Sequence, residues 1–201
     1  MEEEEMFILR ASFSRFGLLF PALALLLVVG CAPKISVLPD NFSGWPQQEF
    51  AGESLWIMNI RLGGKKKFAG LLALKADSES AHLVVLDSSG FTLLEEKLSA
   101  VGPRHVVLAL DVVEKHGLPA YLAKTMGRIL FEWPSEASCQ KFLRKLCWAS
   151  GDPASIEKRN SFGPFSTWQV LYTLQKPDNQ IKLIEYTIPL VANKLSLQRI
   201  E

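Results

Sequence analysis

The chain has 201 residues, a formal net charge of +1, 48% hydrophobic residues and 21% charged residues. This hydrophobic content excludes a disordered or collagen-like chain, and the near balance of charge argues against a dedicated nucleic-acid binder. With the first 30 residues set aside, roughly 170 remain, which is the usual size of one domain. We therefore expect a single folded domain and no nucleic-acid partner.

Residues 16–30 (FGLLFPALALLLVVG) carry no charge and follow Arg10 and Arg15. A transmembrane helix needs ~20 apolar residues, so this run is short for a span and suits the apolar part of a signal peptide. We predict that residues 1–30 are a signal peptide.

The motif VVGC at residues 28–31 resembles the bacterial lipobox. The resemblance implies that Cys31 receives a diacylglycerol, that cleavage precedes it, and that its new amine is acylated, with no other cofactor. Two or three acyl chains hold a domain on a bilayer far more firmly than one chain does. The alternative is an uncleaved anchor with an incidental cysteine.

Ala32 follows the cysteine, where an aspartate would signal retention in the inner membrane. The resemblance therefore implies an outer-membrane lipoprotein that faces the periplasm. Residues 31–52 contain Pro33, Pro39 and Pro46, which interrupt helices and central strands, so we predict a lipidated extended tether. The folded domain is expected over residues 53–201.

Strand patterns dominate the start of this domain. Residues 55–62 and 65–75 flank Gly63-Gly64, a pair that supplies the positive φ of a two-residue turn, so they predict a hairpin. Residues 82–86 and 91–98 predict a second hairpin. Residues 104–110 fit either a further strand or the start of a helix.

The middle of the chain changes to helical spacing. Residues 119–131 place four apolar side chains on one face, with Pro119 in the first turn, and residues 135–148 repeat this pattern behind a serine cap. Residues 151–164 are expected to be a loop, and three strands follow over 167–174, 181–188 and 195–200. The whole pattern predicts an α+β fold with an antiparallel sheet and helices gathered on one face.

Several of the predicted strands are apolar on both faces, notably residues 55–62 and 71–74. A half-exposed sheet would alternate cleanly. Either both faces are covered by a packed core, or one face lines an apolar hollow.

The lipobox, the segments FAGLLALK (68–75) and HLVVLDSSGFTL (82–93), the Leu118-Pro119 helix start and the closing strands resemble the LolA/LolB lipoprotein-carrier superfamily of diderm bacteria. The resemblance implies a curved antiparallel sheet, an incomplete barrel, closed by a helical lid over a cavity for acyl chains. Adaptable aromatic and methionine side chains suit such a cavity. The candidate cavity residues are Trp56, Met58, Phe68, Phe91, Met126, Trp168 and Tyr172, each of which could instead be ordinary core.

One feature departs from the resemblance. The LolB turn that matches residues 87–90 carries a protruding leucine that helps to deliver cargo, and this chain has Ser88 and Ser89 there. Delivery of lipoproteins by that route is therefore in doubt, and a lipid-binding or envelope-assembly relative is the remaining expectation.

Chemistry-bearing motifs are missing from the sequence. His82, His105 and His116 show no metal-ligand spacing, and no nucleophile-elbow or phosphate-loop pattern occurs, so we expect no metal site and no enzyme. Cys139 and Cys147 form an even pair in an oxidising compartment, yet one continuous helix would hold them too far apart. We predict two unpaired, buried thiols.

Lys65, Lys66 and Lys67 follow the first hairpin turn and either protect a solvated edge or attract anionic head groups. Two functions follow from these patterns. The first is an outer-membrane lipoprotein that binds acyl chains or lipidated cargo in an apolar cavity. The second is a structural lipoprotein whose filled core supports a protein-partner module.

Overall fold

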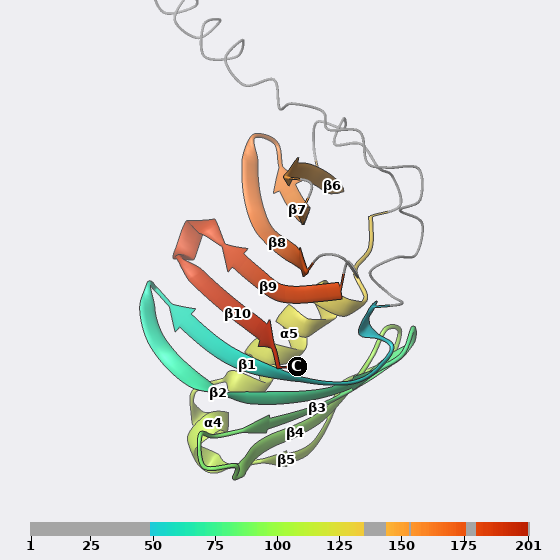
Figure 1. Cartoon of the computed structure of the whole chain (residues 1–201). Helices are drawn as coiled ribbons and strands as arrows, with labels where there is room; N and C mark the ends of the chain where they lie inside the picture. Colours follow the sequence, from blue (N-terminus) through green and yellow to red (C-terminus); the bar gives the residue numbers. More distant parts are fainter. Residues whose placement is uncertain (1–48, 135–143, 153, 176–179, 201) are drawn as a thin grey trace, which may run out of the picture. The chain divides into compact units, whose positions relative to one another are not determined.

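The computed structural model describes residues 49–134, 144–152, 154–175 and 180–200, all within one compact unit, Ser36–Glu201. The predicted signal peptide, Cys31 and nearly all of the predicted tether lie outside the described residues. Ten strands form the body of the domain (Figure 1). They are β1 (Gly52–Leu62), β2 (Lys65–Ala76), β3 (Ser80–Leu86), β4 (Thr92–Ser99), β5 (His105–Ala109), β6 (Arg144–Asp152), β7 (Ser155–Phe162), β8 (Phe165–Gln175), β9 (Gln180–Ile188) and β10 (Asn193–Arg199).

The strands belong to one curved antiparallel sheet in the order β5-β4-β3-β2-β1-β10-β9-β8-β7-β6. Strand β10 pairs with β1 on one side and with β9 on the other, so the C-terminal strand joins the two halves of the sheet. β5 and β6 form its two edges, and the sheet is not closed across the described strands.

The first hairpin confirms the turn that the sequence predicts. Gly63 and Gly64 both have positive φ, 57° and 76°, which glycine adopts without steric cost, and β1 pairs with β2 from Gly52 to Leu62. The second hairpin, β3 with β4, is also present, and residues 105–109 form a strand rather than a helix start.

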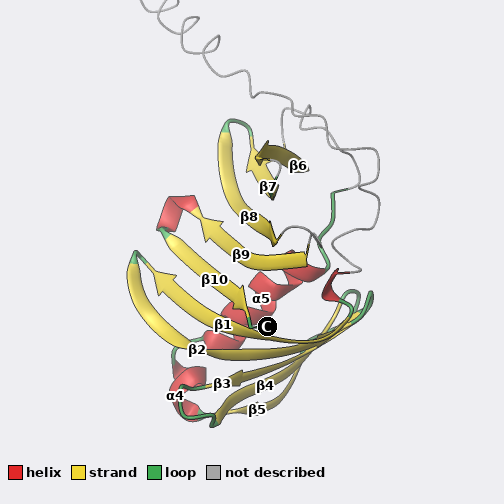
Figure 2. Ribbon diagram, in the orientation of Figure 1, coloured by secondary structure: helices red, strands yellow, loops and turns green. Residues whose placement is uncertain are grey.

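The inner face of the sheet carries the hydrophobic core. Helix α4 (Asp111–Lys115) leads into α5 (Leu118–Leu130), which crosses behind β1, β10 and β9 in Figure 2. Leu122, Met126 and Ile129 of α5 are fully buried in the same cluster as the inward side chains of the strands. The amphipathic helix predicted over residues 119–131 is therefore confirmed within one residue at each end.

The expected α+β fold with a helical lid is wrong. The described chain is chiefly a ten-stranded antiparallel sheet, and its two α-helices have only five and 13 residues. Of the second predicted lid helix, residues 135–143 lie outside the described residues, while residues 144–148 belong to β6, because Arg144 to Asp152 pairs with β7 and extends the sheet. The loop expected over residues 151–164 is likewise mostly strand β7.

The cysteine prediction is also wrong at Cys147, which is disulfide-bonded. The argument for free thiols assumed one helix through this residue, and Cys147 instead lies in β6, paired with Arg159. The other cysteines, Cys31 and Cys139, lie outside the described residues.

Candidate functional site

The residues predicted to line a cavity lie mostly inside the packed core. Six of the seven belong to the hydrophobic cluster or pack against it: Trp56, Met58, Met126, Trp168 and Tyr172 are at most 1% exposed, and Phe68 is half-buried at its margin. These side chains come from β1, β2, α5 and β8, so the fold brings them together. Because other protein atoms cover them almost completely, they are packed as core side chains in this structure.

Phe91 is the exception and lies in the turn between β3 and β4, 71% exposed. Asp87 organises this turn, since its Oδ1 accepts hydrogen bonds from the Ser89 hydroxyl at 2.6 Å and from the Phe91 amide at 3.0 Å. The same bonds lower the pKa of Asp87 below its usual value, with the Ser89 hydroxyl as the largest contribution. The turn therefore presents an apolar side chain beside its two serines.

Sequence reasoning missed Lys158, which points inward from β7 and is fully buried. Its Nζ donates hydrogen bonds to the carbonyls of Arg128 and Ile129 at the end of α5 and lies 4.1 Å from the ring centre of Trp133. Burial lowers the pKa of Lys158 well below its usual value. The signal was weak, because inward-facing polar residues remove the apolar alternation that identifies a strand.

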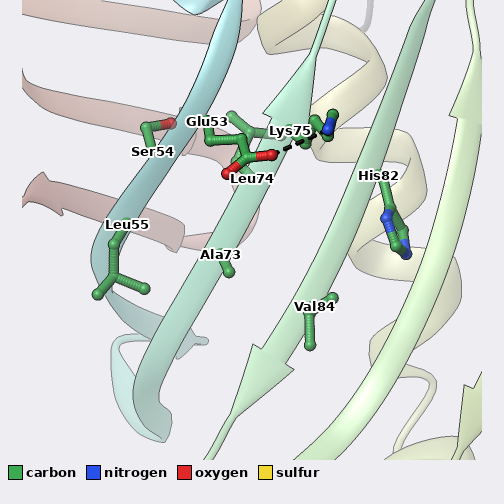
Figure 3. Close-up of a pocket in the computed structure, with 8 residues that line it drawn as sticks. All are labelled: Glu53, Ser54, Leu55, Ala73, Leu74, Lys75, His82 and Val84. Atoms are coloured by element: carbon green, nitrogen blue, oxygen red, sulfur yellow. Dashed lines mark hydrogen bonds and ion pairs between the residues drawn. The ribbon is translucent and has the colours of Figure 1, made fainter.

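An open hollow of about 450 Å³ lies on the outer face of β1, β2 and β3. Leu55, Ala73 and Val84, one from each strand, supply apolar side chains along it (Figure 3). Glu53, Ser54, Leu74, Lys75 and His82 complete the lining.

Ion pairs flank the apolar floor of this hollow. Lys75 Nζ donates a hydrogen bond to Glu53 Oε1 at 2.9 Å, which lowers the pKa of Glu53 and raises that of Lys75 (Figure 3). His82 Nε2 lies 2.9 Å from Glu95 Oε1 on β4. The arrangement is suited to holding an apolar group between two polar borders.

The hollow accounts for the strands that are apolar on both faces. Inward side chains such as Trp56 and Leu72 form the core, and outward ones such as Leu55 and Ile57 remain 36% and 40% exposed. Of the two alternatives left by the sequence, the described residues show a filled inner face and an open hollow on the outer face.

Within the part of the chain that the structure describes, no group of three or more metal-ligating side chains occurs. No helix among those residues is both long and apolar enough to cross a membrane. No protein-family model matches the chain, and no curated protein sequence matches it significantly. The resemblance to the LolA/LolB superfamily therefore stays a prediction.

Proposed function

We propose that the chain is an outer-membrane lipoprotein, anchored through lipid on Cys31 and facing the periplasm, whose folded domain is a non-enzymatic binding module for a protein partner. The charge-free segment 16–30 and the cysteine after it support the anchor. The disulfide at Cys147 supports an extracytoplasmic location, because disulfides persist in oxidising compartments.

The hollow on the outer face is the observation that carries the binding role. Its floor is apolar and open to solvent, and its borders are charged. An apolar side chain of a partner could bury itself there while polar groups around it pair with Lys75, Glu53 or His82. The inner face is already occupied by the protein's own side chains, which favours a surface site over an internal one.

Binding of acyl chains or lipidated cargo is the second candidate function. The core contains Met58 and Met126, whose flexible side chains adapt to irregular ligands. Such binding would require the packed side chains between α5 and the sheet to separate.

Labelling with radioactive palmitate tests the anchor. We expect label on the wild-type protein, together with membrane attachment, and neither in Cys31→Ser. An unlabelled wild-type protein, or a Cys31→Ser variant that is still labelled, would contradict the anchor.

Two measurements on the mature protein separate the binding roles. A mass spectrum of its organic extract reports co-purified lipid, and an apolar fluorescent dye reports an open apolar site. We expect no stoichiometric lipid, and dye binding that Val84→Arg abolishes while Gln198→Arg, elsewhere on the outer face, leaves it intact. Co-purified lipid with dye binding that survives Val84→Arg would favour the internal site instead.

A further inference from the structure

Three neighbouring hairpins end in turns at the same end of the sheet. They are β1–β2, β9–β10 and β7–β8, and the sheet order places them side by side. Pairing of Arg61 with Lys194 and of Gln169 with Thr187 sets their turns at one end (Figure 2). The amide of Gly64 donates a hydrogen bond to the Ala192 carbonyl at 3.0 Å, which ties the first two turns together.

Exposed apolar side chains concentrate in two of these turns. After α5, the large hydrophobic residues of the described chain that are more than half exposed are Phe162, Phe165, Leu190 and Val191. All four flank or form the β7–β8 turn and the short helix η1 (Pro189–Val191) between β9 and β10. Soluble monomers rarely expose grouped apolar side chains without a use for them.

The third turn adds positive charge. Lys65, Lys66 and Lys67 are exposed at the start of β2, and none of them forms an ion pair with a described residue. The three turn segments, 62–67, 161–166 and 188–193, contain no acidic residue. We call the three turns together the rim.

We propose that the rim contacts the surface of an anionic bilayer, with Phe162, Phe165, Leu190 and Val191 at the level of the acyl boundary and the three lysines among the head groups. Apolar side chains with adjacent lysines are the composition that binds such interfaces. The apolar groups sit on protruding turns rather than in a hollow, which suits insertion between lipids better than docking of a rigid partner.

This inference rests on the proposed lipid anchor, which would hold the domain beside a bilayer. The folded domain begins at the opposite end of the sheet from the rim, since β1 runs from Gly52 towards the Gly63 turn. The chain between Cys31 and β1 is about 20 residues and can span up to ~65 Å, whereas an 11-residue strand is ~36 Å long. The predicted tether is therefore long enough for the rim to face the membrane.

Hydrogen exchange on the mature, lipidated protein tests the rim. The protein is placed in vesicles of phosphatidylglycerol with phosphatidylethanolamine, or of phosphatidylcholine alone, and flotation is recorded in parallel. We expect amides of residues 162–166 and 190–192 to exchange at least about fivefold more slowly in the anionic vesicles, since one lysine near such a surface shifts the equilibrium by about that factor. Amides around Val101, which is 99% exposed at the opposite end, are the internal control.

Paired variants complete the test. Leu190→Ser/Val191→Ser and Lys65→Ser/Lys66→Ser/Lys67→Ser should each remove the protection, while Val101→Ser and Lys97→Ser should leave it unchanged. Protein that floats with the vesicles but shows no rim protection, or protection equal to that around Val101, would overturn the rim. Protein that fails to float would instead contradict the lipid anchor.

Discussion

Lys158 and Ile129 are joined by a hydrogen bond from the lysine Nζ to the carbonyl at 3.1 Å, and Tyr172 donates a second bond to the same carbonyl at 2.9 Å. The last carbonyls of a helix have no partner within the helix. Here β7 and β8 supply donors to them, so the C-terminal end of α5 is fixed to the sheet. The cost is a lysine without solvent contact, whose pKa burial lowers.

We predict that Lys158 makes the stability of the domain depend on alkaline pH. Its pKa is ~10.4 in the unfolded chain and lower in the folded one, so between these values the unfolded state binds more protons. The free energy of unfolding should therefore rise as the pH increases towards ~10. Lys158→Met should lack this rise, as measured by urea unfolding at several pH values.

Lys97→Met is the matched control because Lys97 is exposed on β4. It should keep the wild-type pH dependence. A constant difference between wild type and Lys158→Met across this pH range would show that the buried amine does not titrate differently in the folded state.

Two glycines should respond oppositely to alanine. A Cβ at Gly70 in β2 would lie 2.2 Å from the Leu86 carbonyl oxygen, whereas a Cβ at Gly127 in α5 meets nothing within 4 Å. We expect Gly70→Ala to lower the free energy of unfolding by about 1–3 kcal/mol, as overpacking does, and Gly127→Ala to raise it by about 0.5–1 kcal/mol through helix propensity. Thermal and urea unfolding would measure both, and a neutral Gly70→Ala would contradict the close approach of β3.

Met126 and Phe91 were both candidates for a cavity wall, and the structure separates them. Met126 is fully buried and Phe91 is 71% exposed. Met126→Ala should cost about 2–5 kcal/mol of stability, while Phe91→Ala should change it by less than about 0.5 kcal/mol. If Met126→Ala proved nearly neutral and created a dye-binding site, the internal site of the second candidate function would gain support.

The β1–β2 hairpin and α5 could be predicted from sequence because local chemistry determines them. Gly63-Gly64 permits the turn, and the spacing of Leu122, Met126 and Ile129 produces a helix with one buried face. The outer hollow could be predicted only as one of two alternatives. Apolar residues on both strand faces do not reveal which face the rest of the chain covers.

The second half of the chain was harder to predict because its strands depend on distant partners. Leu146 fits a helical spacing with residues 139, 142 and 143, yet it is also two residues from Trp148, which is typical of a strand. The pairing of Trp148 with Lys158 favours the strand. Lys158 itself could not be predicted as a core residue, because a lysine is buried only when groups from elsewhere in the fold receive it.

The disulfide of Cys147 connects the structure to the proposed anchor. The chain has three cysteines, so if Cys31 carries lipid, the partner of Cys147 must be Cys139. A non-reducing peptide map of the mature protein should show the 139–147 link, and Cys31→Ser should keep it. Cys139→Ser should abolish it and lower stability by roughly 2–3 kcal/mol, the loop-closure value for so short a loop. A link between Cys31 and Cys147 would occupy the thiol that lipidation requires, and would therefore contradict the lipoprotein proposal as well as the pairing.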